Sequence, residues 1–344
     1  MNLAGTLAGI GATDQGAYAD ALEHHLRLAK PPYALGRLES LGAQLASIAG
    51  RCPPPIPDPA RIVVAAGDHG VVAQAVTRWP PELSGVLAAT VAAGVAGVNV
   101  LASLAGAQVR VLDVGLSAPV AGVEAVPVRR GTGDITVTAA MQRSEAIAAV
   151  ELGIREAELA RDHGVRCLAT GEVGIGNTTP AAALIAVFTG TEAAAVTGRG
   201  ADSQPEMVAH KAAKVAAALA LHRPDPADPI GVLAAVGGVE AAVLTGLVLG
   251  AARRRLPVLL DGVTGAAAGL AAVALCPPVA GYLVAAHAGT EPGISVAHRQ
   301  LGLYPVLDLG LALGEGTGAA LALPILRAAV AVMTDMATLE SLLG

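Results

Sequence analysis

Two glutamates stand in glycine-rich segments that give their carboxylates little steric cover. Glu172 lies in Gly-Glu-Val-Gly after a short apolar run, and Glu315 lies between two glycines ahead of a long apolar segment. A carboxylate that is partly desolvated in a cleft has a raised pKa and can act as a general base. The alternative is a structural acid at a helix N-terminus, which the helix dipole stabilises. The spacing alone leaves both interpretations open.

The segment around Glu172 also has the composition of a phosphate-binding loop. Residues 171–179 read Gly-Glu-Val-Gly-Ile-Gly-Asn-Thr-Thr and precede a predicted helix. Glycines let a backbone approach a phosphate closely, and a helix N-terminus offers unpaired N–H groups. The loop is neither a Walker A motif nor a G-x-G-x-x-G fingerprint, and a tight structural turn is the alternative. Arg199 between two glycines, and Lys211 further on, are weaker phosphate candidates.

Several polar side chains follow apolar runs that are typical of buried strands. In an open α/β sheet, ligands bind outside the carboxyl ends of the strands, so these side chains are candidates for a site. Capping of the next helix is the ordinary alternative for each of them. No metal site is expected, because the histidines lack a ligand at i+4 and a cysteine neighbour. The candidates at strand ends are Asp68, His69, Asp113, Glu172, Asp261 and His287.

The alternation of short β-branched runs with Ala-rich stretches predicts βαβ units and a mainly parallel sheet flanked by helices. The expected strands cover residues 61–66, 109–112, 166–170, 257–260 and 282–286. The expected helices cover residues 19–28, 82–105, 143–163, 179–189, 205–221, 239–253, 266–275 and 317–343, the last in two pieces. The proline cluster at residues 52–57 predicts an extended linker, since proline blocks helix and central strand alike.

Composition narrows the class of protein. Of 344 residues 53% are apolar, and 22 Lys and Arg against 28 Asp and Glu give a formal charge of −6. An acidic chain in which no basic run is longer than Arg253–Arg255 argues against nucleic-acid binding. Three separated cysteines argue against a disulfide framework and favour a reducing cytoplasm, and no signal peptide is recognised. Residues 83–109 and 262–289 carry no charge, but their Ala and Gly content with polar interruptions favours buried elements over membrane spans.

These motifs, in this order, resemble the nicotinate-nucleotide–dimethylbenzimidazole phosphoribosyltransferase family of cobalamin biosynthesis. The resemblance covers about residues 58–338. It is carried mainly by Ala-Gly-Asp-His-Gly at residues 66–70, the loop at 171–179, and Leu-Gly-Glu-Gly-Thr-Gly-Ala-Ala at 313–320; shorter matches are Asn99 to Ala102, Leu-Asp-Gly at 260–262 and Glu-Pro-Gly at 291–293. The family implies a Rossmann-like sheet, a small helical domain built from both termini, and a homodimer.

The resemblance also implies a reaction and roles for particular residues. Phosphoribose would pass from nicotinate mononucleotide to 5,6-dimethylbenzimidazole, giving nicotinate and α-ribazole 5′-phosphate without metal, ATP or another cofactor. The family's general base falls on Glu315 and its second glutamate on Glu172. The nucleotide and its phosphate would bind Gly174, Gly176, Asn177, Thr178, Gly200, Lys211, Gly314 and Gly316. The base pocket would comprise Asp68, His69, Trp79, Val86, Asp261, Thr290 and Glu291.

The division implied for the chain is an N-terminal helical segment with its linker at residues 1–57, an α/β domain at 58–312, and a catalytic loop with C-terminal helices at 313–344. The chain departs from the family pattern around Trp79, Val86 and Val263, which concerns the acceptor base. Two alternatives follow: the same donor with another benzimidazole, a purine or a phenol as acceptor, or a non-catalytic nucleotide-binding subunit. Neither nucleic acid nor a membrane is expected as a partner.

Overall fold

A six-stranded parallel sheet forms the centre of the molecule. The computed structural model describes residues 2–201 and 205–343, and its strand order is β3-β2-β1-β4-β5-β6. This is the Rossmann order, in which the direction of strand addition reverses between β1 and β4. The strands are β1 (Ala60–Gly67), β2 (Ala107–Gly115), β3 (Glu124–Ala125), β4 (Cys167–Val173), β5 (Val258–Leu260) and β6 (Leu283–Ala285); β7 (His287–Gly289) and β8 (Leu307–Leu311) form a separate parallel pair.

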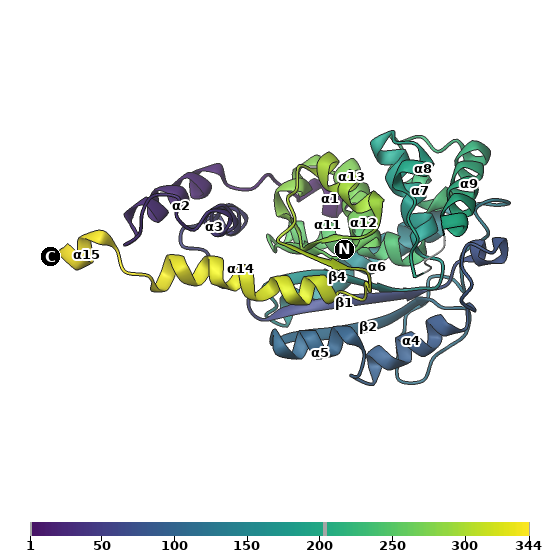
Figure 1. The fold of residues 1–344 in the computed structure, drawn as a ribbon, viewed down its shortest axis with the longest axis horizontal. Helices are drawn as coiled ribbons and strands as arrows, with labels where there is room; N and C mark the ends of the chain where they lie inside the picture. Colours follow the sequence, from purple (N-terminus) through teal and green to yellow (C-terminus); the bar gives the residue numbers. More distant parts are fainter. Residues whose placement is uncertain (1, 202–204, 344) are drawn as a thin grey trace.

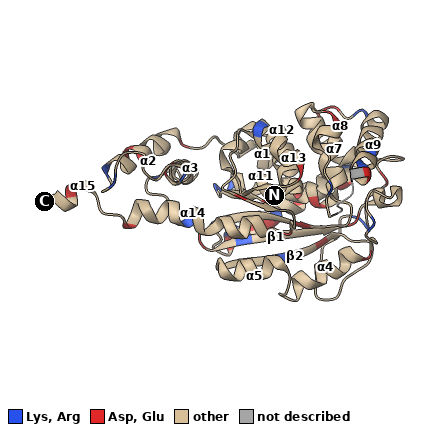
Figure 2. Ribbon diagram, in the orientation of Figure 1, with Lys and Arg blue, Asp and Glu red and all other residues tan. Residues whose placement is uncertain are grey.

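Helices cover both faces of the sheet, so its strands are buried on both sides (Figure 1). Alternate residues of β1 serve the two cores: Val63 and Ala65 face one, and Ile62 and Val64 face the other. This period of two is the side-chain geometry of a strand, and burial on both faces explains why the run is apolar throughout. Most of the ribbon is neither acidic nor basic (Figure 2).

One layer contains α6 (Arg143–Asp162), α11 (Val239–Arg253) and α12 (Val263–Leu275), whereas α4 (Leu83–Ala92), α5 (Gly97–Leu104) and the start of α14 (Thr317–Asp335) pack on the other face. The remaining helices are α1 (Leu3–Ala8), α2 (Gln15–Arg27), α3 (Arg37–Ala49), α7 (Thr178–Thr189), α8 (Ala193–Val196), α9 (Pro205–His222), α10 (Pro229–Val236), α13 (Pro292–Leu301) and α15 (Leu339–Leu343), with 3-10 turns η1 (Gly70–Gln74) and η2 (Pro277–Tyr282).

Segments from both ends of the chain pack together at one end of the molecule (Figure 1). Ala21 and Ala43 of α2 and α3 share a small core with Met333 of α14, and His24 bonds the Met333 carbonyl oxygen at 2.7 Å. By contrast, α1 packs against α6 and α11, where Glu151 accepts a hydrogen bond from the Leu3 N–H. The terminal helices thus associate, while the division at residues 57 and 312 stays a prediction.

The expected strands all form, and the expected helices form with one important difference. Residues 82–105 make two helices, α4 and α5, separated at residues 93–96, and much of their surface is exposed. Gly94 adopts a left-handed φ of 79° at this break, a conformation that glycine tolerates. The sequence predicted a helical segment within residues 1–57 but gave no bounds for α1 and α3, and it did not predict α8, α10, α13 or the short strands β3, β7 and β8.

Two segments of the described chain have the length and hydropathy of a membrane span: Leu83–Leu104 and Thr317–Asp335. The first is the interrupted pair α4 and α5, and the second is α14, whose first half packs under the sheet. Residues 262–289, the other uncharged stretch, form the buried helix α12, a turn and strands. We interpret all three as parts of the globular fold.

Helices α6 and α11 approach so closely that only glycine fits at the contact. A Cβ at Gly153 would lie 1.8 Å from the Val243 carbonyl oxygen, and one at Gly246 would lie 1.8 Å from that of Val150. Separations this short cannot exist, so any side chain would force the two helices apart.

We therefore expect Gly153→Ala to lower the free energy of unfolding by about 3 kcal/mol, because overpacking outweighs the roughly 1 kcal/mol by which alanine favours a helix. Urea denaturation measures the change. Gly11→Ala is the control, since a Cβ at Gly11 would meet nothing within 4 Å. Equal stability of the two variants would contradict the close contact.

Candidate active site

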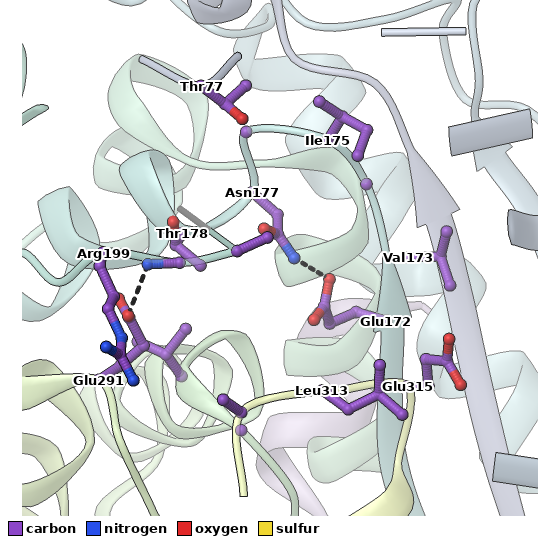
Figure 3. A pocket seen from close by; sticks show the side chains of 18 of the residues that line it. Thr77, Glu172, Val173, Ile175, Asn177, Thr178, Arg199, Glu291, Leu313 and Glu315 are labelled. Carbon is purple, nitrogen blue, oxygen red and sulfur yellow. Dashed lines mark hydrogen bonds between the residues drawn. The ribbon is translucent and has the colours of Figure 1, made fainter. Parts of the chain in front are cut away.

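A cavity of about 240 Å³ opens at the carboxyl end of the sheet, beside the point where strand order reverses. Six separate parts of the described chain surround it (Figure 3). They are residues 76–79 with Leu87, the β4–α7 loop, residues 199–201 with Lys211 of α9, residues 262–263, the β7–α13 region, and the loop before α14. Of the predicted site residues, the cavity is lined by Trp79, Glu172, Gly174, Gly176, Asn177, Thr178, Gly200, Lys211, Thr290, Glu291, Gly314 and Glu315.

One end of this cavity combines a buried cation, a hydroxyl group and glycines. Lys211 is 2% exposed, and its ammonium group donates to Thr178 Oγ1 at 2.7 Å. Gly200 has a φ of 58°, and a Cβ there would lie 3.0 Å from the same hydroxyl and 3.2 Å from Lys211 Nζ. A larger residue would therefore fill the space beside the ammonium. Lys211 of α9 thus meets the N-terminus of α7 among small residues, and this environment suits a phosphate.

Glu291 positions the loop at this end. Its Oε1 accepts a hydrogen bond from the Gly200 N–H at 2.7 Å, the second dashed line in Figure 3. A Cβ at Gly198 would lie 2.5 Å from the same carboxylate, so the loop wraps tightly around it. The sequence assigned Glu291 to the base pocket; in the structure it holds the backbone on the Lys211 side. Arg199, one of the weaker phosphate candidates, also lines the cavity.

Glu172 points into the open space of the cavity (Figure 3). Its Oε2 accepts a hydrogen bond from the Asn177 amide. Burial raises the pKa of Glu172 to about 8. The hydrogen bond from Asn177 lowers this pKa, whereas the nearby negative charges of Glu240, Asp261 and Glu315 raise it further. Near neutral pH this side chain therefore holds its proton readily, which suits a group that exchanges hydrogen bonds or protons with a ligand.

Glu315 occupies a turn of three consecutive left-handed residues. Gly314, Glu315 and Gly316 have φ values of 78°, 61° and 102°. The glycines adopt these angles freely, whereas a non-glycine residue does so at a cost of about 1–3 kcal/mol. Glu315 is 8% exposed and its Oε2 accepts from the Val98 N–H at 3.3 Å, at the start of α5. Burial raises the pKa of Glu315, and the negative charge of Asp261 also raises it, whereas the hydrogen bond from Val98 lowers it.

Asp261 holds this strained turn in place. Its two carboxylate oxygens accept hydrogen bonds from the Gly316 N–H at 3.0 Å and the Ala319 N–H at 2.9 Å, at the N-terminus of α14. His287 Nε2 lies 3.6 Å from Asp261 Oδ1. Burial lowers the pKa of His287, but the carboxylate outweighs burial and the net pKa is raised. Asp261 therefore lies beneath the cavity, where it supports the loop.

Five predicted site residues do not line the cavity. Gly316 belongs to the Glu315 turn but donates its N–H to Asp261 behind the turn, and Asp68 accepts a hydrogen bond from the Ser117 N–H instead. Val86 is 59% exposed on α4, and its neighbour Leu87 lines the cavity in its place. The fifth residue is His69. The family resemblance implied these residues for the site. For Val86 and Leu87, a one-residue difference along α4 decides which side chain faces inward.

His69 forms a buried pair with Glu240, a residue that sequence analysis missed. His69 Nε2 lies 3.4 Å from Glu240 Oε1, and both side chains are almost fully buried. Burial lowers the pKa of His69 to about 4 and raises that of Glu240 to about 8, so both are neutral at intermediate pH. The imidazole packs against Gly174, behind the loop that lines the cavity. The Gly237-Gly238 pair before Glu240 was the only local sequence signal.

Within residues 2–201 and 205–343, no cluster of three or more His, Cys, Asp or Glu side chains could hold a metal ion. The carboxyl groups at the cavity each have a partner in the protein: Glu172 contacts Asn177, Glu315 the Val98 N–H and Glu291 the Gly200 N–H. What the arrangement offers is a basic, glycine-lined end, two carboxyl groups with raised pKa values, and apolar walls that include Trp79 and Leu313.

The fold and cavity define an α/β enzyme of Rossmann topology with a nucleotide-sized site at the carboxyl ends of its strands. The family model described as phosphoribosyltransferase matches residues 10–342. The chain belongs to the nicotinate-nucleotide–dimethylbenzimidazole phosphoribosyltransferase family.

Relatives of that name support this membership over the full chain. The protein from Salinispora tropica is 52% identical over 99% of this chain and 98% of its own length, and that from Solidesulfovibrio magneticus is 46% identical over 98% and 97%. A crystal structure of the Thermus thermophilus protein of the same name has a TM-score of 0.90 at 39% identity, covering 96% of this chain and 98% of that one. The expected family and fold class are thus confirmed.

The thermal stability of the protein should depend on pH through its buried carboxyl groups. Glu240 has a folded-state pKa of about 8, above the roughly 4.5 of an exposed glutamate. A raised folded-state pKa gives stability that is fully present below the unfolded pKa and is lost as pH rises through about 8. We expect Glu240→Gln to reduce the fall in Tm between pH 6 and pH 9, measured by thermal denaturation. The exposed Glu23→Gln is the control, and an unchanged slope in Glu240→Gln would contradict the assignment.

Proposed function

We propose that the protein transfers phosphoribose from nicotinate mononucleotide to 5,6-dimethylbenzimidazole, releasing nicotinate and forming α-ribazole 5′-phosphate. The observation that carries this proposal is the buried Glu315, with a raised pKa, in the same cavity as Lys211 and the glycine loop. Full-length similarity to relatives named for this activity supports it.

In this proposal, the donor's phosphate binds the basic end of the cavity. Lys211 and Thr178 supply a cation and a hydroxyl group 2.7 Å apart. Gly174, Gly176 and Gly200 line the cavity there, so the backbone can approach a phosphate closely. Asn177 is the N-cap of α7 behind it. The ribose would then extend toward Glu172 and the Gly314–Gly316 turn, which places its anomeric carbon between the two carboxyl groups.

The chemistry requires one proton acceptor and no metal. The unprotonated ring nitrogen of the benzimidazole attacks C1′ on the face opposite nicotinate, forming a C–N bond. The C1′–N bond to nicotinate breaks, and its electron pair returns to the pyridinium nitrogen. Glu315 takes the proton from the other ring nitrogen of the benzimidazole, so the product ring is neutral. Attack on the opposite face converts the β-glycoside into the α-riboside.

Glu172 would assist from the other side of the ribose. As positive charge develops at C1′, a nearby carboxylate stabilises it, as in other reactions with an oxocarbenium-like transition state. The Asn177 hydrogen bond fixes the orientation of Glu172. A cationic pyridinium donor in the cavity would favour the ionised form of this side chain, against the burial that raises its pKa.

We expect Glu315→Gln to reduce turnover by about 10²–10⁴-fold, the usual contribution of a general base. The donor's binding should persist, because the phosphate end is unchanged. Chromatography of α-ribazole 5′-phosphate and calorimetry with nicotinate mononucleotide measure the two effects. The exposed Glu340→Gln serves as the control. Undiminished turnover by Glu315→Gln would contradict the role of Glu315 as general base. If the wild type binds the donor but transfers phosphoribose to none of the acceptors, the protein would instead be a non-catalytic nucleotide-binding subunit.

A different acceptor base is the second candidate. The exposed Trp79 and the apolar Leu87, Val263 and Leu313 form the wall where the base would lie, and this part of the sequence departs from the family pattern. Competition of dimethylbenzimidazole with other benzimidazoles, purines and phenols in one reaction, followed by mass spectrometry, ranks the acceptors. Exclusive use of dimethylbenzimidazole would eliminate the alternative.

We also propose that the protein acts as a homodimer in the cytoplasm. Large apolar side chains stay exposed on the projecting terminal segments: Tyr33 is 73% exposed, Leu342 65% and Leu343 84%. Burial of such side chains by a second copy would be favourable by about 1.5–3 kcal/mol each. Cys52, Cys167 and Cys276 are free thiols, in keeping with a reducing compartment.

The dimer proposal predicts that Leu342→Glu with Leu343→Glu yields a monomer, because two charges would have to be buried in the contact. Light scattering coupled to gel filtration measures the mass. Leu221→Glu on α9, also an exposed leucine, is the matched control and should remain dimeric. A monomeric wild type, or a dimeric double variant, would contradict the proposed contact.

A further inference from the structure

A second cavity, of about 330 Å³, lies at the opposite end of the sheet from the candidate active site. It is formed where α3 ends, where the proline linker passes, and where α6 and α11 end. Arg166 and Pro257, which line it, directly precede β4 and β5, so the cavity faces the amino ends of the strands. It shares no residue with the cavity around Glu315.

The lining of this cavity is strongly basic. Five of its twelve described lining residues are arginines, and none of the twelve is Asp or Glu, although the whole chain has a formal charge of −6. The five come from three distant parts of the sequence, and only Arg254 and Arg255 belong to a basic run, at residues 253–255. They are Arg51, Arg161, Arg166, Arg254 and Arg255.

Most of these guanidinium groups are not neutralised by the protein. Arg255 donates to the carbonyl oxygens of Ile48 at 2.9 Å and Ser47 at 3.0 Å, neither of which carries a charge. Arg254 lies 3.5 Å from Asp162, and both side chains are exposed. Within residues 2–201 and 205–343, the exposed side chains of Arg51, Arg161 and Arg166 form no ion pair or hydrogen bond. Like charges gathered in this way repel one another unless an anion lies among them.

Backbone strain accompanies the cluster. Arg255 follows the end of α11 with a φ of 54°, at a position where helices usually have glycine. An arginine there, held to the end of α3 by two carbonyl groups, fixes one wall of the cavity. The floor is apolar and rigid, with Pro55, Pro57 and Leu256. A guanidinium group binds phosphate through two parallel hydrogen bonds, and an apolar floor strengthens the interaction by excluding water.

We propose that this cavity binds a small anion with two or more phosphate groups, at a site separate from the transferase reaction. Its volume is near the lower limit of ordinary ligand pockets and would hold a di- or triphosphate group with part of an attached ring. Because the cavity joins α3 to the sheet, a bound anion would link the terminal helices to the α/β core. Binding to the folded chain alone would also raise its Tm.

The test is calorimetric titration of the full chain with inorganic tripolyphosphate and, separately, with ATP. All proteins carry Lys211→Met, which weakens phosphate binding at the candidate active site, so the result does not depend on the proposed activity. We expect Arg161→Glu with Arg166→Glu to raise the Kd at least tenfold, and the milder Arg166→Gln to raise it severalfold. Arg223→Glu with Arg299→Glu, exposed arginines on other surfaces, is the charge-matched control and should bind like its parent.

Tighter binding of ATP than of tripolyphosphate would indicate that the ring contacts the proline floor, and equal binding would indicate recognition of phosphate alone; both support the site. Absence of binding by the Lys211→Met parent would overturn the proposal. An equal increase of the Kd in the control variant with Arg223→Glu and Arg299→Glu would also overturn the proposal, since the weaker binding would then follow from net charge alone. Circular dichroism checks that each variant is folded. If the variant with Arg161→Glu and Arg166→Glu does not fold, the Kd of the milder Arg166→Gln variant decides the result.

Discussion

The carboxylate of Asp261 is the interaction on which the candidate site depends. It accepts two backbone N–H groups at the start of α14 and so ties the end of β5 to the turn that presents Glu315. Without these bonds, a buried carboxylate would be costly and the left-handed turn at Gly314–Gly316 would lack support. One side chain thus couples the sheet, the C-terminal helix and the proposed base.

A second constraint is the concentration of carboxyl groups in a small buried volume. Glu172, Glu240 and Glu315 all have raised pKa values because burial disfavours their charged forms, and the acidic neighbours of Glu172 and Glu315 add to the effect. The pKa values of about 8 let Glu172 and Glu240 hold or release protons near neutral pH, and the raised pKa of Glu315 makes its carboxylate a stronger base than that of an exposed glutamate. The Lys211 end of the cavity has the opposite character, so the two ends would bind chemically different parts of one substrate.

The small residues of this chain make that arrangement possible. Alanine and glycine on α6 and α11 allow the helices to pack in near backbone contact over the sheet. The same residue types shape the loops: Gly198 wraps around Glu291, and Gly200 leaves space beside Lys211. Only 2% of the chain is aromatic, so its core is closely packed through backbone proximity, where other proteins use large side chains.

The five central strands could be predicted because their burial on both faces requires uninterrupted apolar runs, a local property of the sequence. The place of Glu172 beside the cavity also followed, since the carboxyl ends of parallel strands meet at one edge of a sheet. That Glu315 lines the same cavity was implied only by the family resemblance. The supporting role of Asp261, the His69–Glu240 pair and the arginines around the second cavity could not be predicted. Each joins residues tens to hundreds of positions apart, and no local pattern encodes such a distance. Local patterns of residues were therefore sufficient to predict the strands, the glycine loops and the family. Which side chains face the cavity, and which support it from behind, depends on how distant segments pack and became known only from the folded chain.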